Sequence, residues 1–105
     1  MQKLAVFGGT FNPVHNGHLH LVRQFAHRIG ADRVLLIPTR IPPHKAVQDL
    51  ASARDRLEMC RLAVKQDGFE VSAIEIERDG PSYTSDTLFA VKRENPDSEL
   101  FFITG

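Results

Sequence analysis

The sequence lacks several features that would assign it to a broad class of protein at once. It has a single cysteine, Cys60, which excludes an internal disulfide or a cluster of thiolates. It carries 13 Lys and Arg against 13 Asp and Glu, so it has no strong single-sign field of the kind that a nonspecific DNA-binding protein uses. Its longest apolar runs, such as residues 34–37, are far shorter than the roughly 18 residues of a membrane span.

These absences indicate a cytoplasmic protein with neither nucleic-acid nor membrane partners. A reducing compartment agrees with the low cysteine content. Residues 1–4 lead directly into a strand-like run, so we expect no signal peptide. At 105 residues the chain has the length of one small domain.

The apolar residues alternate between strand-like and helix-like patterns. Four segments have the composition of strands: residues 4–7, 33–37, 69–76 and 100–103. Three have the apolar spacing or the capping residues of helices: residues 17–29, 52–68 and 84–94. We expect Gly30 to cap the end of the first, and Ser52 or Asp49 to cap the start of the second, which Gly68 ends. Strands separated by helices predict an α/β fold with a mostly parallel sheet and flanking helices, in one domain over residues 1–105.

The predicted helix over residues 52–68 has one apolar face. Leu57, Cys60 and Val64 share it, and Met59 and Ala63 widen it. Cys60 is expected there as a small buried apolar residue. We expect Arg56 to be a surface charge or a member of a helix ion pair, although Glu58 is too close in sequence to face it on a helix.

A glycine-rich turn follows the first predicted strand and leads into the first predicted helix. Paired Gly8 and Gly9 let backbone N–H groups approach an anion, and a helix start adds unpaired donors. His15 and His18 are three residues apart, so their imidazoles reach the same side and can donate hydrogen bonds to phosphate oxygens. The same pair could instead hold a metal ion, although the sequence offers no obvious third ligand.

The motif resembles the nucleotidyltransferase superfamily, with His15-Asn16-Gly17-His18 as its His-x-Gly-His signature. Residues 8–18, Gly-Gly-Thr-Phe-Asn-Pro-Val-His-Asn-Gly-His, are similar to the bacterial nicotinate-mononucleotide adenylyltransferases. Related enzymes that adenylylate phosphopantetheine usually have Asp in place of Asn12 and Thr in place of His15. Three further segments resemble the nicotinate-nucleotide family: residues 42–45, 56–59 and 82–88. The resemblance implies a Rossmann-like sheet of the His-x-Gly-His type.

The resemblance also implies a reaction, in which the 5′-phosphate of nicotinate mononucleotide attacks the α-phosphate of ATP and pyrophosphate leaves. Mg²⁺ is expected to arrive with ATP, because no carboxylate cluster indicates a protein-built metal site. The implied catalytic residues are His15 and His18. The implied ATP-binding residues are Gly9, Thr10, Phe11, Gly17 and His18. The implied substrate-binding residues are Gly8, Asn12, His44, Lys45, Tyr83 and Thr84.

Two functions stay open at this point. Members of the resembled family are about twice as long and continue with a second phosphate motif, so the chain is expected to be the N-terminal part of such a domain, truncated after the fourth strand. It is then either a weak or inactive adenylyltransferase or a non-catalytic module that binds nucleotide phosphates. A related adenylyl- or cytidylyltransferase is the alternative within the enzyme class. An uncovered fourth strand also predicts a homo-oligomer that forms through the sheet edge.

Several site residues also have ordinary structural interpretations. Tyr83 and Thr84 could form only a turn and a helix cap. His44 and Lys45 would without the resemblance be an exposed loop. His20 and His27 are expected on the solvent-facing side of their helix and are assigned no role.

Overall fold

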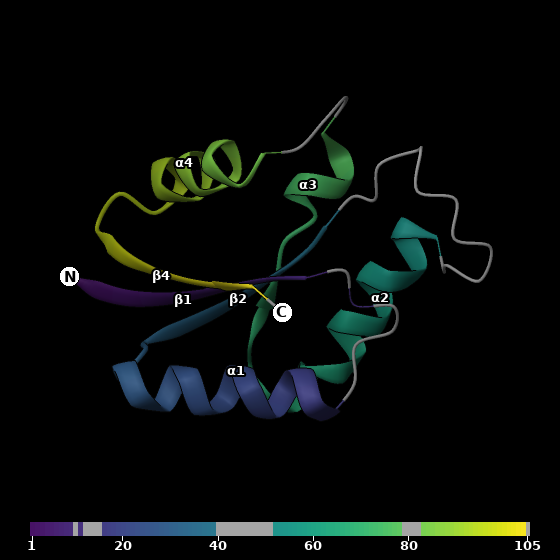
Figure 1. Ribbon diagram of the computed structural model, residues 1–105, viewed down its shortest axis with the longest axis horizontal. Helices are drawn as coiled ribbons and strands as arrows, with labels where there is room; N and C mark the ends of the chain where they lie inside the picture. Colours follow the sequence, from purple (N-terminus) through teal and green to yellow (C-terminus); the bar gives the residue numbers. More distant parts are fainter. Residues whose placement is uncertain (10, 12–15, 40–51, 79–82, 105) are drawn as a thin grey trace.

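A computed structural model of the chain describes residues 1–9, 11, 16–39, 52–78 and 83–104 (Figure 1). Within them, strands alternate with helical segments, as the apolar pattern predicted. The elements are β1 (Gln2–Gly9), α1 (Asn16–Ile29), β2 (Arg33–Pro38), α2 (Ala53–Ala63), the 3₁₀ turn η1 (Lys65–Asp67), β3 (Glu70–Val71), α3 (Ile74–Glu77), α4 (Thr84–Glu94) and β4 (Ser98–Thr104).

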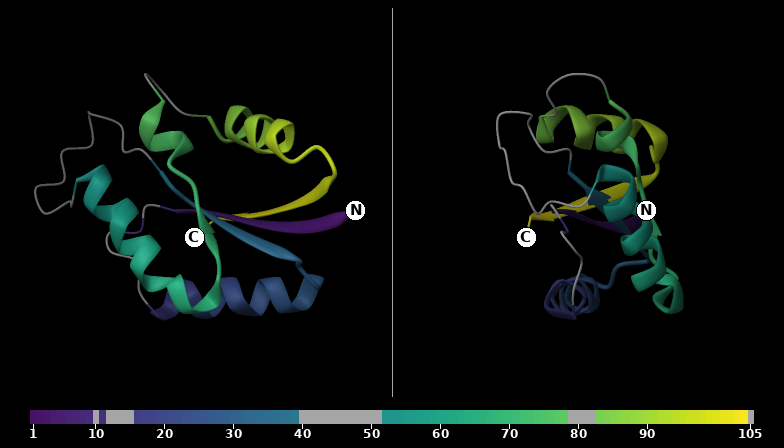
Figure 2. Two further views of the ribbon diagram at one scale, coloured as in Figure 1. Left: turned by 180° about the vertical axis from the view of Figure 1, so that it is seen from behind. Right: turned by 90° about the vertical axis from the view of Figure 1, so that its right-hand side faces the viewer.

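The strands form a parallel sheet in the order β3-β2-β1-β4, which confirms the predicted fold class. β1 lies between β2 and β4, with Leu4 opposite both Arg33 and Leu100. α1 and α2 cover one face of the sheet and α3 and α4 cover the other (Figure 1 and Figure 2). In this order β4 is an edge strand, as expected.

The core has two halves because β1 is covered on both faces. Ala5 and Phe7 pack on the side of α1, where Val22 contributes to the same cluster. Leu4 and Val6 lie on the opposite side with Val91 of α4 in their cluster. Alternate residues of a strand point to opposite faces, so a strand buried on both sides has the uninterrupted apolar run seen in the sequence.

The third strand was predicted over residues 69–76, and this prediction was wrong in its second half. β3 contains only two residues, and the chain turns into the short helix α3. The Ser72 hydroxyl accepts a hydrogen bond from the backbone N–H of Ile74 at 3.2 Å, which favours a helical turn over an extended strand. The carboxylate of Glu75 in that turn accepts a hydrogen bond from Thr87 at 2.8 Å, and both residues are buried. These polar contacts come from tertiary structure and outweigh the β-branched pattern.

The apolar face of α2 is partly as predicted. Leu57, Cys60 and Val64 are buried, and burial raises the pKa of the Cys60 thiol to about 11. Met59 is 38% exposed and does not widen this face. Arg56 was expected on the surface, but only 2% of it is exposed. Its side chain points inward because it donates a hydrogen bond to backbone within the fold, as described below.

The helix ends follow the predicted capping residues with one difference. The Ser52 hydroxyl accepts from the backbone N–H of Asp55 at 3.1 Å, and Gly30 adopts the left-handed conformation after α1, with a φ of 66°. The second helix ends at Ala63 and not at Gly68, because η1 follows it. Gly68 is left-handed with a φ of 70° and closes that turn.

Leu36 and Leu62 provide a matched test of the core. Leu36 is completely buried in β2, whereas Leu62 on α2 is 67% exposed. We expect Leu36→Ala to lower the free energy of unfolding by about 3 kcal/mol, since it leaves a cavity between packed layers. Leu62→Ala should change it by no more than about 0.5 kcal/mol. Urea unfolding followed by circular dichroism measures both values, and equal effects of the two substitutions would contradict this layered core.

Candidate functional site

The candidate site lies at the carboxyl end of β1. After β1 the chain passes to β2 and β3 on one side and returns to β4 on the other, so the strand order reverses at β1. Gly8 near the end of β1 is opposite Ile37 of β2 and Thr104 of β4. Ligands of open α/β sheets bind in the crevice outside such a reversal point. The glycine-rich turn predicted from the sequence therefore begins where this fold type places its ligands.

The two glycines differ in the space around them. A Cβ atom on Gly9 would be 3.0 Å from Cε1 of Phe11, a distance that forces the ring or the backbone to move. A Cβ atom on Gly8 would be 3.4 Å from the Phe102 ring, which is ordinary contact. A side chain at Gly9 would need the Phe11 ring to move by a few tenths of an ångström, whereas Gly8 has a little more room.

Phe11 is held in an unusual conformation beside these glycines. Its φ of 50° is in the left-handed region, which a bulky side chain rarely adopts. The ring is nonetheless buried, and it stacks on Phe7 of β1 with centroids 5.6 Å apart and an interplanar angle of 25°. Burial against the sheet offsets the backbone strain, so the turn is anchored by its own aromatic residue.

His18 packs against the same ring. The imidazole lies edge-on to Phe11, with centroids 5.2 Å apart and an interplanar angle of 88°. His18 is in the first turn of α1 and is half-buried, while the preceding Gly17 is exposed. The sequence suggested only a backbone role for Phe11, and the ring contact that orients His18 could not be read from it.

The structure brings together some of the predicted site residues and separates others. The Phe11 ring lies against Gly9 at the end of β1 and against His18 at the start of α1, so these three residues are close together. Tyr83 and Thr84 are exposed at the start of α4, which packs on the opposite face of the sheet from α1. The remaining predicted residues lie outside the described part of the chain: Thr10, Asn12, His15, His44 and Lys45.

Tyr83 caps the start of α4, which agrees with the interpretation of residues 83 and 84 as a turn and a helix cap. The Tyr83 carbonyl accepts the backbone N–H of Thr87 at 3.1 Å, so Tyr83 occupies the position before the helix. Its side chain makes no capping hydrogen bond, and 61% of the residue is exposed. The phenol is therefore accessible for contacts outside the fold. On α1, His20 and His27 are exposed, as expected.

Arg56 is the residue near this site that the sequence interpretation missed. Its Nη1 donates to the Thr39 carbonyl at 2.8 Å, and the Thr39 N–H donates to the Gly9 carbonyl at 2.8 Å. Burial lowers the pKa of the Arg56 guanidinium from its usual value, since the charged form loses water contacts. One signal was present, because Arg56 is four residues before Cys60 and so shares its helical stripe.

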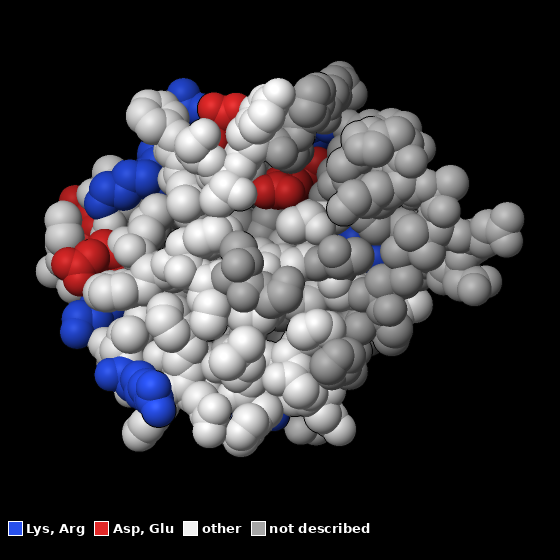
Figure 3. Space-filling view, in the orientation of Figure 1, with Lys and Arg blue, Asp and Glu red and all other residues white. Residues whose placement is uncertain are grey.

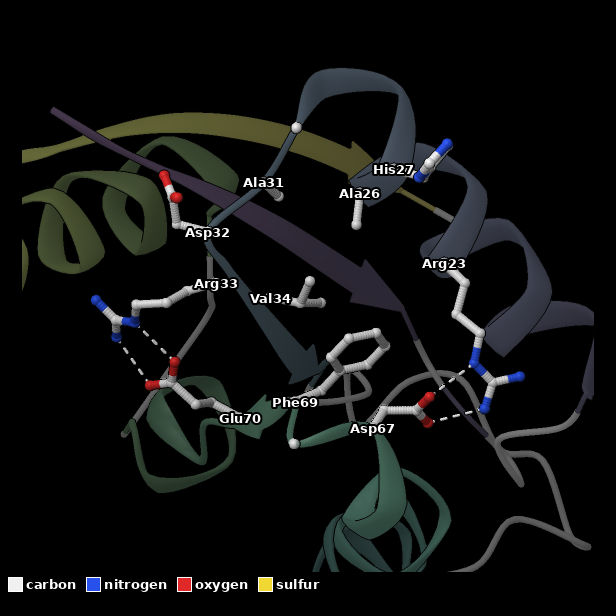
Figure 4. Close-up of a pocket in the computed structure, with 12 residues that line it drawn as sticks. Arg23, Ala26, His27, Ala31, Asp32, Arg33, Val34, Asp67, Phe69 and Glu70 are labelled. Carbon is white, nitrogen blue, oxygen red and sulfur yellow. Dashed lines mark hydrogen bonds and ion pairs between the residues drawn. The ribbon is translucent and has the colours of Figure 1, made fainter.

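A second hollow lies at the other end of the sheet, beside the start of β2 and β3 (Figure 4). It has a volume of about 400 Å³ and an apolar floor that includes Val34 and Phe69. Two ion pairs flank this floor, as Figure 4 shows. They are Arg23–Asp67 and Arg33–Glu70, each with two hydrogen bonds of 2.8–2.9 Å.

These ion pairs neutralise four of the charged side chains that line the second hollow, whose lining also includes Asp32. The hydrogen bond from Arg23 lowers the pKa of the Asp67 carboxyl, and that from Arg33 lowers the pKa of the Glu70 carboxyl. Both acids are held ionised by these guanidinium groups. A charged ligand that binds Arg23, Arg33, Asp67 or Glu70 would have to compete with these pairs, so the hollow is a weaker candidate than the glycine turn.

The described residues contain no group of three or more His, Cys, Asp or Glu side chains that could hold a metal ion. In the same part of the chain, no helix is long and apolar enough to cross a bilayer.

Comparison with known families adds to this geometry. Residues 6–105 match the cytidylyltransferase-like family. The chain belongs to this family. The matched residues contain α1, β2, β3, β4 and the carboxyl end of β1, together with the glycine-rich segment that follows it.

Two curated relatives are both named as nicotinate-nucleotide adenylyltransferases. Nicotinate-nucleotide adenylyltransferase of Bacillus subtilis is 42% identical over 106 residues, which cover 100% of this chain and 56% of the relative. A probable nicotinate-nucleotide adenylyltransferase of Desulfatibacillum aliphaticivorans is 49% identical over 104 residues, covering 98% of this chain and 47% of the relative. The chain thus spans about half the length of the relatives it matches.

A solved structure shows the same fold. The nicotinic acid mononucleotide adenylyltransferase of Plasmodium falciparum, complexed with NaAD, superposes with a TM-score of 0.77 at 16% identity. The superposition covers 97% of this chain and 51% of that protein. At this identity the likeness concerns the fold alone, and it agrees with the α/β architecture of the cytidylyltransferase-like family.

The adjacent glycines of this cytidylyltransferase-like chain give a matched test of the turn. Gly9→Ala should lower the free energy of unfolding by about 1–3 kcal/mol, because the new methyl group overlaps the buried Phe11 ring. Gly8→Ala should cost less, since its methyl group would make ordinary contact with Phe102. Urea unfolding gives both values. A Gly9→Ala protein as stable as Gly8→Ala would show that the ring is not packed as described.

Proposed function

We propose that the chain binds ATP and nicotinate mononucleotide and carries the reaction centre of an adenylyltransferase that makes deamido-NAD. The observation that carries this proposal is the Gly9–Phe11–His18 turn at the end of β1, in a chain 42% identical to the Bacillus subtilis enzyme. Relatives of that name supply the substrate class. The turn supplies the chemistry, because backbone N–H groups and an oriented imidazole suit a triphosphate. We place this reaction in the cytoplasm.

The proposed reaction is an in-line displacement at phosphorus. An oxygen of the nicotinate mononucleotide phosphate forms a bond to the α-phosphorus of ATP, and the bond from that phosphorus to the bridging oxygen breaks. Pyrophosphate leaves with the electron pair, so no covalent enzyme intermediate is needed. Mg²⁺ enters with the triphosphate as part of the substrate. Catalysis of this kind depends on alignment and on stabilising charge at the phosphate oxygens.

The chain's own residues divide between the two substrates in this proposal. His18 donates a hydrogen bond to the phosphate oxygens as charge builds up, and His15 acts beside it. The triphosphate lies along Gly9, the N–H groups of Thr10 and Phe11, and Gly17. Nicotinate mononucleotide is held by Gly8, Asn12, His44, Lys45, Tyr83 and Thr84. The exposed phenol and backbone at Tyr83 support a role for α4 at the nicotinate end.

A second candidate function is nucleotide-phosphate binding without turnover. The observation that favours it is length, since the chain spans about half of the relatives it matches. The glycine turn would still bind phosphates, while groups needed for turnover would be absent. A related adenylyl- or cytidylyltransferase activity is the remaining alternative, because the family as a whole is not limited to one nucleotide or acceptor.

Histidine substitutions on α1 test the proposed phosphate site. His18→Ala should weaken MgATP binding about tenfold or more, since a charge-assisted hydrogen bond contributes about 1.5–3 kcal/mol. His20→Ala removes an exposed imidazole from the same helix and should leave binding unchanged. Calorimetric titration measures both. Wild-type affinity in His18→Ala, or no binding by the unchanged chain, would contradict the site.

A pyrophosphate-release assay with ATP and nicotinate mononucleotide then separates the two functions. We expect this 105-residue chain to turn over well below the order of 1 s⁻¹ that is ordinary for enzymes. Ordinary turnover would remove the binding-only alternative and would correct our expectation that the chain is weakly active. ATP binding with no pyrophosphate release would favour that alternative.

We further propose that β4 pairs with β4 of a second copy. As the edge strand, β4 has backbone groups that no strand of the described residues covers. It faces the viewer in Figure 1, as the turned view in Figure 2 shows, and Figure 3 shows mostly uncharged side chains over it. Lys and Arg side chains lie mainly toward one end of this view, so like charges do not oppose an approaching copy.

Sedimentation at increasing protein concentration tests this pairing. We expect a dimer, and we expect Phe101→Lys in β4 to shift the equilibrium to monomer, because a charge on an edge strand opposes pairing. Phe89→Lys on α4 is the control, since Phe89 is 70% exposed and lies outside the sheet. A monomer at high concentration, or equal effects of both substitutions, would contradict the proposed edge contact.

A further inference from the structure

We propose that Arg56 is a positioning residue for the phosphate turn, which it holds in place through the backbone of Thr39. This inference rests on the proposed function, because it assumes that the turn from Gly9 to His18 receives the triphosphate. Arg56 itself is 2% exposed and cannot contact a ligand. Its effect therefore passes through a series of direct contacts.

The first contact joins α2 to the end of β2. The Arg56 Nη1 donates to the Thr39 carbonyl oxygen at 2.8 Å, from the first part of α2 to the residue directly after the strand. A hydrogen bond from a charged donor inside a protein is stronger than a neutral one. The hydrogen bond therefore fixes the Thr39 carbonyl directly after the last residue of β2.

The second contact joins the N–H of the same residue, Thr39, to the glycine turn. The Thr39 N–H donates to the Gly9 carbonyl at 2.8 Å, one residue beyond the register pair of Gly9 with Pro38. Thr39 thus extends the pairing of β2 with β1 up to the start of the turn. A shift of Thr39 would shift the Gly9 carbonyl and with it the direction in which the chain leaves β1.

The last contacts lead from Gly9 to the imidazole. The space of a Gly9 side chain is filled by the Phe11 ring, which is 3.0 Å from an ideal Cβ position. The same ring lies edge-on to His18 with centroids 5.2 Å apart. Close-packed groups of this kind transmit small displacements because no empty volume absorbs them. Arg56 is in this way connected to His18 by four consecutive contacts.

The cost of burying Arg56 supports a positioning role over a purely stabilising one. Removing a guanidinium from water is expensive, and an apolar residue of similar volume is often equally or more stabilising at such a place. Leu57, Cys60 and Val64 on the same face show that α2 can pack on the sheet with apolar side chains. A methionine at position 56 would keep the volume, but it could not donate to Thr39.

The experiment compares Arg56→Met with Arg54→Met, which removes an exposed arginine from the same helix. Two properties are measured: the NMR resonances of the His18 ring protons, assigned with His18→Ala, and the affinity for MgATP. The Phe11 ring lies edge-on to the imidazole, so its ring current makes those resonances sensitive to displacement. We expect Arg56→Met to move them and to weaken MgATP binding about tenfold, within the range of ordinary coupling between sites. Arg54→Met should change neither.

Arg56→Lys serves if Arg56→Met does not fold. Lysine keeps the charge but lacks the planar fork of arginine, so we expect smaller changes in the same direction. Either variant, when folded, overturns the inference if it keeps both the His18 resonances and the MgATP affinity of the unchanged chain. If the unchanged chain does not bind MgATP, the proposed function fails, while the His18 resonances still decide whether Arg56 positions the turn.

Discussion

The two-sided burial of β1 is the constraint on which the rest of the structure depends. Its backbone pairs with β2 and β4, and its side chains are packed on both faces. A slip of one residue would exchange Phe7 for Val6 on the α1 side and disrupt both halves of the core, so the register is fixed. The point where β1 ends at Gly9 is therefore fixed as well. The proposed phosphate-binding turn, which begins at Gly9, therefore takes its starting position from the whole sheet.

Much of this architecture could be predicted because it depends on patterns that are local in sequence. Uninterrupted apolar runs marked β1 and β2, and Gly30 and Ser52 marked the end of one helix and the start of another. The order of elements then determined the parallel sheet. Such predictions succeed where the local preference of a segment and its tertiary surroundings agree.

The failures occurred where tertiary contacts outweighed local preference. Ile74 and Ile76 have the alternation of a strand, but the buried hydrogen bond between Thr87 and Glu75 holds this segment as a helical turn. Arginine is usually a surface residue, but Arg56 is spaced along α2 like the buried Cys60. The hydrogen bond to Thr39 favours the buried position. In each case the hydrogen-bond partner is more than ten residues away in the sequence, and the apolar periodicity of a segment carries no information about such a partner.

In the candidate site, too, the residue types could be read from the sequence, whereas their packing could not. The sequence allowed a prediction that the glycines and histidines of the turn bind phosphate, but it gave no sign that the Phe11 ring packs on Phe7 and His18. Its left-handed backbone is unfavourable for a phenylalanine, and the packing of its buried ring on Phe7 and His18 offsets that cost. Strain of this kind is compatible with a turn whose shape is imposed by the surrounding fold.

The sheet also explains how one small domain could bring two substrates together. His18 lies on the α1 side, whereas Tyr83 and Thr84 lie on the α4 side, and β1 is the strand packed against both. In the proposed transfer, the two phosphates must meet in line at the carboxyl edge between these faces. The zero net charge fits this arrangement, because the turn needs only local donors. At the opposite end, the charges of Arg23 and Arg33 are already paired with those of Asp67 and Glu70, so these arginines are less available to a triphosphate.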